Sequence, residues 1–147
     1  MDKAIIGIEQ AINNFLKADL TPINWDFKID VNKWSKKEIL GHLIDSALIN
    51  LQRFIRCTYE ENFKLTYQQV EYVNIQQYQN MPVEDLLTLW RLINRQIVKV
   101  LKSYPNNRRE AVCDTGKNAI ELHPVEFLVS DYLDHLLHHL NQITNNN

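Results

Sequence analysis

Apolar residues recur along the chain at intervals of three and four, which is the spacing of one buried face of an α-helix. Such stretches cover Ala4–Lys17, Ser35 to about Thr58, and Val83–Ser103, and a fourth opens at Pro124 and continues towards the C-terminus. No segment alternates convincingly between apolar and polar residues, as a half-buried strand would. The pattern therefore predicts an all-α fold, a four-helix bundle.

Residues with capping roles stand at the ends of these stretches. Ser35 and Glu38 have the spacing of a capping box, in which the two side chains satisfy each other's backbone N–H groups. Pro82 and Pro124 suit a first helical turn, because proline has no N–H to leave unpaired there. These signals place the helix ends between the periodic stretches and not inside them.

The connecting segments carry weaker patterns. Tyr59–Asn80 is long for a bundle connection and has no clear period, so we expect a short helix over one end of the bundle. Asn106–Leu122 is predicted to hold a short hairpin, and the Asn-rich last residues are predicted to fray. With 147 residues, 45% of them apolar, the chain is large enough for one core, and residues 1–147 are predicted to form a single domain.

Composition excludes several classes of function. The net charge of −2 comes from 16 basic and 18 acidic residues that are scattered along the chain, so no basic stripe is available for nucleic acid. No apolar run approaches the roughly 20 residues of a membrane span, and a soluble, cytoplasmic protein is expected. Cys57 and Cys113 are interpreted as two reduced thiols, since their number and spacing fit neither a disulfide scaffold nor a C-x-x-C site.

Three of the five histidines lie within five residues of the last predicted helix. His135 and His139 are four residues apart and share a helix face, at the edge of the apolar arc. His138 points farther towards the polar side, where Asp134 is its expected partner. His135 and His139 can therefore direct two imidazoles to one point, as a metal-binding helix does.

A third histidine lies on the second predicted helix. His42, Ser46, Asn50 and Arg53 form a polar strip beside the apolar arc, and such strips line internal clefts in helix bundles. His42 together with the later pair would give three nitrogen ligands and leave coordination positions open, which is typical of a catalytic metal site. Asp45 lies away from the arc and is interpreted as a solvated acid.

Structural explanations compete with this hypothesis. A histidine pair at i and i+4 is often surface decoration, and the sequence alone does not establish that the two helices are neighbours. His123 is interpreted as an end-of-loop residue. The three tryptophans are interpreted as packing residues and not as a substrate platform; they are Trp25, Trp34 and Trp90.

The motif residues together resemble the DinB/YfiT-like superfamily of metal-dependent enzymes. The resemblance extends from the second helix to the C-terminus, and its most specific part is the ordered combination of His42 with the late His-x3-His. The matching residues are Trp34, Ser35, Glu38, Ile39, Leu40, Gly41, His42, Leu43, Ile44, Asp45, Ser46, Asn50, Arg53, His135, His138, His139 and Gln142.

The resemblance implies an antiparallel four-helix bundle in which three histidines bind a divalent metal, commonly Ni²⁺ or Zn²⁺. In this chain those positions match His42, His135 and His139. Members of the superfamily include transferases and isomerases that use low-molecular-weight thiols such as bacillithiol, mycothiol or glutathione. DNA is not an expected substrate.

The leading hypothesis is a transferase in which the metal lowers the pKa of a thiol co-substrate and presents the thiolate to an electrophile. Arg53, with Asn50 and Ser46 on the same strip, is predicted to bind this thiol, the guanidinium orienting an anionic group. Asp131 and Gln142 are predicted to hold the outer nitrogens of the ligand imidazoles.

Two alternatives remain open from the sequence. The same ligands could serve a hydrolase that uses metal-bound water, although the strip contains no distinctive general base. A third hypothesis is a non-catalytic bundle that binds metal or pairs with a second copy of itself. A small-molecule substrate and a homodimer are the partners that these hypotheses allow.

Overall fold

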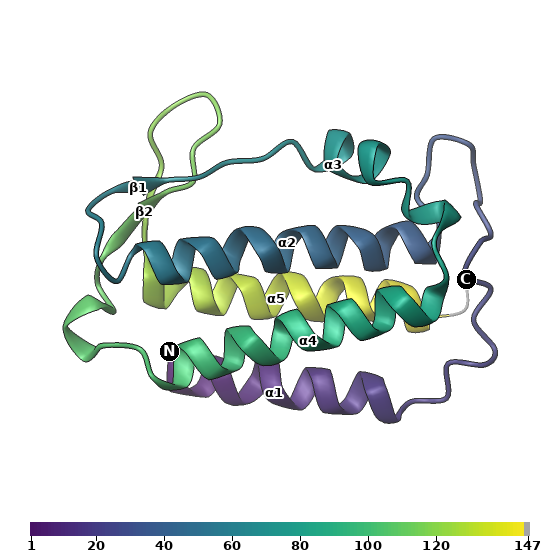
Figure 1. Ribbon diagram of the computed structural model, residues 1–147, viewed down its shortest axis with the longest axis horizontal. Coiled ribbons are helices and arrows are strands. Elements are labelled where there is room, and N and C mark those ends of the chain that lie inside the picture. Colours follow the sequence, from purple (N-terminus) through teal and green to yellow (C-terminus); the bar gives the residue numbers. More distant parts are fainter. Residues whose placement is uncertain (146–147) are drawn as a thin grey trace.

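The computed structural model describes residues 1–145, so the last two residues, where fraying was predicted, lie outside the described part. Four long helices run side by side in Figure 1: α1 (Asp2–Lys17), α2 (Lys36–Arg56), α4 (Val83–Lys102) and α5 (Val125–Thr144). The predicted four-helix bundle is confirmed. The first helix begins two residues earlier than predicted, and the other helix ends agree to within about two residues.

The helices form a square in which α1 and α2 occupy opposite corners and each packs against α4 and α5. The neighbours α2 and α5 are antiparallel, as are α1 and α4. Helices α2 and α4 run in the same direction, because the segment between them returns along the length of the bundle (Figure 1). The α2–α5 interface and the α1–α4 interface consequently lie on opposite sides of the square.

The segment between α2 and α4 contains the predicted short helix, α3 (Gln69–Gln76), followed by a 3₁₀ turn, η1 (Tyr78–Asn80). Helix α3 lies against the side of α2, near its N-terminal half, and not over one end of the bundle as predicted (Figure 1). The segment also contributes a two-residue strand, β1 (Phe63–Lys64), which the sequence pattern did not indicate.

The predicted hairpin is present between α4 and α5. A 3₁₀ turn, η2 (Asn106–Arg108), precedes β2 (Val112–Asp114), which pairs antiparallel with β3 (Leu122–Pro124). Strand β1 adds to the other edge of β2 in parallel, so residues 1–145 contain one three-stranded sheet at the end of the bundle. None of the helices in this described part is long and apolar enough to cross a membrane.

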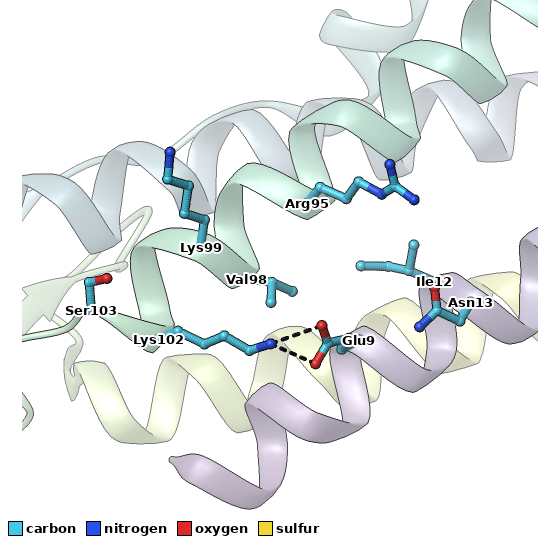
Figure 2. Close-up of a pocket in the computed structure, with 8 residues that line it drawn as sticks. All are labelled: Glu9, Ile12, Asn13, Arg95, Val98, Lys99, Lys102 and Ser103. Atoms are coloured by element: carbon cyan, nitrogen blue, oxygen red, sulfur yellow. Dashed lines mark hydrogen bonds and ion pairs between the residues drawn. The ribbon is translucent and has the colours of Figure 1, made fainter.

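A surface groove of about 430 Å³ separates α1 from α4 (Figure 2). Its floor contains Ile12 and Val98, and Lys102 closes one end through an ion pair with Glu9 at 2.8 Å. Arg95 extends over the groove from α4. The groove belongs to the α1–α4 side of the square and is therefore remote from the α2–α5 interface.

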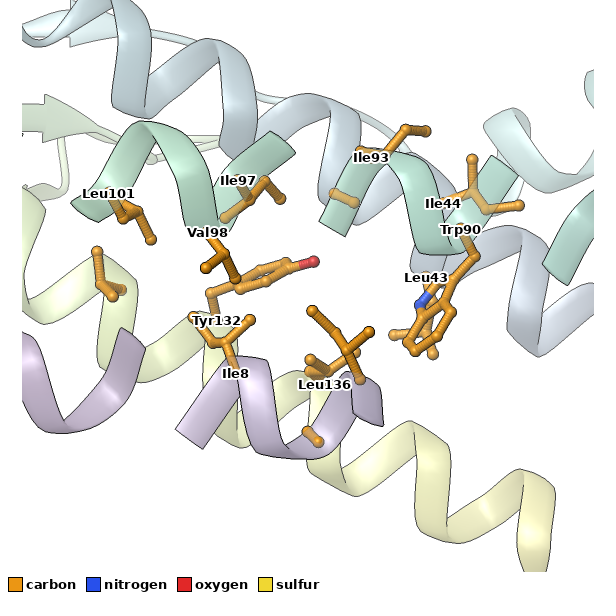
Figure 3. Packing of buried hydrophobic residues seen from close by; sticks show 14 of the residues in the cluster. Ile8, Leu43, Ile44, Trp90, Ile93, Ile97, Val98, Leu101, Tyr132 and Leu136 are labelled. Atoms are coloured by element: carbon orange, nitrogen blue, oxygen red, sulfur yellow. The ribbon is translucent and has the colours of Figure 1, made fainter. Parts of the chain in front are cut away.

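The core fills the space between the four long helices. Side chains from each of them point inward in Figure 3, among them Ile8, Leu43, Trp90 and Leu136, all less than 2% exposed. Tyr132 is also buried there, and its hydroxyl donates to Asn94 Oδ1 at 2.6 Å. This bond gives the phenol a partner inside an otherwise apolar interior.

The two cysteines meet where α2 ends beside the sheet. Both are free thiols and fully buried. The proximity of the Cys113 thiol, together with burial, raises the pKa of Cys57. The separation of 56 positions in the sequence concealed this proximity.

Candidate metal centre

The three predicted histidines converge at the α2–α5 interface. His42 lies two turns into α2, where the Ser35–Glu38 capping box fixes the start of the helix. His135 and His139 project from one face of the antiparallel neighbour α5. One nitrogen from each ring lies within 4.8 Å of the other two. The fold thus supplies the helix adjacency that the sequence could not establish.

The distances within this cluster fit a small metal ion. His42 Nε2 and His135 Nε2 are 3.1 Å apart. Tetrahedral coordination with metal–nitrogen bonds of about 2.0–2.1 Å would place two ligand nitrogens roughly 3.3 Å apart. The centroids of the His139 ring and the His42 ring are 4.9 Å apart, and those of His139 and His135 are 4.5 Å apart. The donor set therefore suits a divalent cation held by three imidazoles, which fill three of the four positions of a tetrahedral ion.

Burial keeps these rings in the neutral form that binds metal. His42 is 1% exposed, and burial, reinforced by the charges of the other two histidines, lowers its pKa to about 3. Burial followed by repulsion from His139 and His138 lowers the pKa of His135 to about 4. The pKa of His139 is also lowered, chiefly by burial. At neutral pH all three rings are uncharged and retain a lone pair for a cation.

Side chains around the cluster hold two of the rings by their outer nitrogens. His139 Nδ1 donates to Gln142 Oε1 at 2.7 Å, which leaves Nε2 for the centre. Gln142 therefore holds the outer nitrogen of a ligand imidazole, as predicted. His135 Nδ1 lies 3.5 Å from Ser46 Oγ. Asp131 was predicted to accept from this nitrogen of His135. That prediction was wrong, because Ser46 faces the nitrogen from the neighbouring helix and Asp131 is exposed.

The other two histidines are not part of the three-nitrogen cluster, although the His138 ring contacts that of His139 with centroids 4.9 Å apart. His138 is exposed and its Nε2 accepts from Gln142 Nε2 at 3.1 Å, so the predicted pairing with Asp134 was wrong. His123 lies in β3, 3.0 Å from Glu121 Oε1, with its ring stacked on Phe127.

The polar strip of α2 continues away from the histidines. Asn50 Nδ2 donates to the Ser46 carbonyl oxygen at 2.9 Å, and Arg53 Nη1 donates to Asn50 Oδ1 at 3.3 Å. Arg53 Nε and Nη2 both donate to the Leu65 carbonyl oxygen. These bonds anchor the chain after β1 to α2 and fix the guanidinium at the end of the strip.

Asp45 corrects the sequence-based expectation. It was interpreted as a solvated acid, yet it is fully buried, because α3 and η1 cover this side of α2. Its Oδ1 accepts from Tyr78 Oη at 2.6 Å and from Gln76 Nε2, and Oδ2 is buried with no partner among residues 1–145. Burial outweighs these bonds and raises the pKa of Asp45 to about 6.

Neither of two aromatic residues that lie near the centre was assigned to the site from the sequence. The Trp34 ring lies over His42, with centroids 5.1 Å apart and planes tilted by 34°. Tyr67 lies in the segment between β1 and α3, and burial raises the pKa of its phenol to about 12. The position of Trp34 just before the capping box marked it only as a packing residue, and Tyr67 lies in a stretch without periodicity.

Comparisons with known proteins extend the assignment of the fold. The sequence matches no protein-family model and no curated protein. Its structure is similar to YfiT from Bacillus subtilis, described as a probable metal-dependent hydrolase with an unusual four-helix bundle topology, with a TM-score of 0.84. That match has 18% sequence identity and covers 97% of this chain and 83% of YfiT.

A second similar structure is a mycothiol-dependent maleylpyruvate isomerase, with a TM-score of 0.75 and 9% identity. The match covers 96% of this chain but only 57% of the isomerase, so this chain spans little more than half of that protein. The predicted resemblance to DinB/YfiT-like proteins is confirmed as a likeness of fold.

Proposed function

We propose that this protein is a divalent-metal-dependent enzyme with His42, His135 and His139 as the metal ligands. The observation that carries the proposal is the convergence of three neutral imidazoles from two facing helices, with one nitrogen of each within 4.8 Å of the others. Nitrogen ligands suit Zn²⁺ and Ni²⁺. When bound, such a cation supplies Lewis acidity that lowers the pKa of a thiol or of water in the open position.

The first candidate activity is transfer of a low-molecular-weight thiol to an electrophile. Three neutral ligands, whose outer partners are the neutral Ser46 and Gln142, leave the full +2 charge of the cation uncompensated. Such a centre favours an anionic ligand, and a thiolate is a strong nucleophile even at neutral pH. The likeness to a mycothiol-dependent isomerase supports the same class of co-substrate.

The strip along α2 is proposed as the binding site for the rest of the thiol. Ser46 and Arg53 are seven residues apart, which corresponds to about 10 Å along a helix. A guanidinium has five N–H donors, and the bonds from Arg53 to Leu65 and Asn50 occupy three of them. Arg53 can therefore bind an anionic group, such as a carboxylate, that lies on the order of 10 Å from the sulfur.

Hydrolysis is the second candidate. It is supported by the likeness to YfiT, which is described as a probable metal-dependent hydrolase and whose structure matches 97% of this chain. A hydrolase needs a group that takes a proton from water. Asp45 has a suitable pKa of about 6, but its oxygens are buried beneath Tyr78 and Gln76. We therefore rank thiol transfer first.

The test is a pair of assays on protein loaded with Zn²⁺ or Ni²⁺. Glutathione or bacillithiol is supplied with 1-chloro-2,4-dinitrobenzene, and thioether formation is followed; p-nitrophenyl acetate without thiol reports hydrolysis. Metal-dependent thioether formation that is lost in His42→Ala supports the transferase. His123→Ala is the matched control, because this histidine lies in β3, away from the centre.

Other outcomes separate the alternatives. Ester cleavage without thiol, equally sensitive to His42→Ala, would replace transfer by hydrolysis. Stoichiometric metal without either reaction would favour the non-catalytic metal-binding bundle. A cytoplasmic location and a homodimer remain predictions, and sedimentation velocity would decide the oligomeric state.

A further inference from the structure

The polar strip of α2 has almost no accessible surface in this structure. Ser46 is 4% exposed and Asn50 is 9% exposed, although both side chains are polar. A co-substrate that binds along this strip needs side chains that it can touch, and these two are covered. Part of the protein must therefore move away from α2 before a small molecule can bind there.

The segment between β1 and η1 is attached to α2 at both ends of the strip. Arg53 Nε and Nη2 donate to the Leu65 carbonyl oxygen at 3.1 and 2.6 Å. Gln76 Nε2 donates to Asp45 Oδ1 at the other end. Asp45 and Arg53 are eight residues apart, about 12 Å along a helix, and the two covered side chains lie between them in the sequence. The segment therefore spans the part of α2 that carries the strip (Figure 1).

The chain is held firmly on either side of residues 66–76. Leu65 N–H donates to the Asp114 carbonyl oxygen at 3.3 Å, which continues the pairing of β1 with β2. Tyr78 is 2% exposed, and its ring fills the space that a Cβ at Gly41 would need. Movement of the residues between these two points would leave the sheet and η1 in place.

The residues between these two points make few contacts that would hold them down. Helix α3 buries only Val73, and Gln76 adds one hydrogen bond to α2. Val70 and Ile75 on the same helix are 50% and 81% exposed. Gln77, which joins α3 to η1, has a φ of 53°, in the left-handed region that residues with a Cβ rarely adopt. Few buried apolar contacts beside a strained residue are the features of a segment that opens locally while the core stays folded.

We propose that residues 66–76 form a lid that closes over the polar strip of α2 and opens, with Gln77 as its hinge, to admit the co-substrate. The buried Val73 side chain and the hydrogen bond from Gln76 to Asp45 hold the lid closed. The role in admitting a thiol rests on the proposed function, whereas the opening is a property of the metal-free protein.

The first test measures whether the strip becomes accessible. Ser46→Cys places a thiol on the strip, and its modification by iodoacetamide is followed in metal-free protein. Cys57 and Cys113 are 0% exposed, and protein with Ser46 intact gives their background rate. The new thiol reacts only while the lid is open, so the rate reports the open population. Val73→Ala removes two methyl groups from the closing contact and should raise this rate roughly tenfold.

Val70→Ala is the matched control, because it makes the same substitution in the same helix at a side chain that is 50% exposed. Gln76→Ala and Gln69→Ala form a second pair, since within residues 1–145 only the former loses a side-chain hydrogen bond, the one to Asp45. We expect faster modification in Val73→Ala and Gln76→Ala and an unchanged rate in the two controls. Circular dichroism establishes that each variant is folded.

Urea separates opening of the lid from unfolding of the whole chain. Movement of a short segment exposes little surface, so the modification rate of Ser46→Cys should be nearly independent of urea at low concentration. Unfolding of the whole chain exposes the core and would make the rate rise steeply from the first addition of urea. Such a steep rise, or equal rates in Val73→Ala and Val70→Ala, would overturn the proposal.

Binding of glutathione to Zn²⁺-loaded protein relates the lid to the proposed function. Only the open population admits the co-substrate, so the association rate in Val73→Ala should rise by the same factor as the modification rate. An unchanged association rate despite faster modification would overturn the role in admission. If neither Zn²⁺ nor glutathione binds while modification behaves as expected, the proposed function fails and the lid stands. If glutathione binds but modification requires unfolding of the whole chain, the lid fails and the proposed function stands.

Discussion

Individual residues at the centre divide into those that helical geometry reveals and those that only the fold reveals. His42, His135 and His139 were predictable because each lies at a definite angle on a strongly amphipathic helix. The burial of Asp45 was not predictable, because its position on the helical wheel indicates exposure to solvent unless another element covers that side of α2. The covering residues, Gln76 and Tyr78, belong to a segment without hydrophobic periodicity.

The burial of Asp45 makes the free energy of unfolding depend on pH. Burial raises its pKa from 3.8 to about 6, so the folded protein holds this proton more tightly than the unfolded chain. The resulting stabilisation is complete below about pH 4 and is lost as the pH rises through about 6. Relative to Asp45→Asn, the wild type should lose up to roughly 1.4 kcal/mol of unfolding free energy per pH unit in this range.

Urea unfolding of both proteins between pH 4 and pH 8 measures this difference. Asn retains an oxygen that can accept from Tyr78, so the comparison isolates the ionisation. Asp30→Asn, which removes an exposed loop carboxylate, is the control. A difference between wild type and Asp45→Asn that stays constant with pH would contradict the assignment.

At the scale of elements, the predictions succeeded where side-chain chemistry acts locally. The α2 capping box has both of its reciprocal hydrogen bonds, because Ser35 and Glu38 need only their own helix turn to form them. Strand β1 has two residues and therefore no pattern to detect. Helix α3 buries only Val73, so its sequence carries almost no amphipathic signal.

The contact between α2 and η1 depends on a glycine within a helix. A Cβ at Gly41 would overlap the ring of Tyr78, which is 2% exposed and bonded to Asp45. Alanine is intrinsically the better helix former by about 1 kcal/mol. We nevertheless expect Gly41→Ala to destabilise the protein by about 1–3 kcal/mol, because a buried ring must move. Chemical denaturation measures the change.

Gly7→Ala provides the matched control for this substitution. A Cβ at Gly7, in the middle of α1, would meet the terminal methyl groups of the partly buried Leu133, which can rotate away. Gly7→Ala should therefore be neutral or stabilising, in line with helix propensity. If Gly41→Ala behaved in the same way, the close approach of Tyr78 would not be required by the fold.

For the whole molecule, the amphipathic pattern determined the bundle but not the path of the chain. Nothing in the apolar spacing indicates that residues 57–82 return along the bundle, which makes α2 and α4 parallel and places α5 opposite His42. The metal centre is a product of this long-range arrangement. Its existence could be proposed from three histidines, but the adjacency of their helices required the tertiary structure.

Because the centre joins α2 to α5, a bound cation should stabilise the entire fold. A ligand at 100 times its Kd stabilises the folded state by about 2.7 kcal/mol if it does not bind the unfolded chain. For a domain of this size that corresponds to a rise in Tm of roughly 5–10 °C. Zn²⁺ or Ni²⁺ should produce this rise in scanning calorimetry, and excess EDTA should reverse it.

The same experiment on single variants tests whether both helices are needed. His42→Ala removes the α2 ligand and His139→Ala removes one from α5, so each should lose most of the metal-induced rise while staying folded without metal. His123→Ala should keep the full rise, because its side chain is occupied by Glu121 and Phe127, away from the centre. An equal rise in wild type and His42→Ala would mean that the cation binds α5 alone, and the bundle would then gain no cross-link between its helices from the metal.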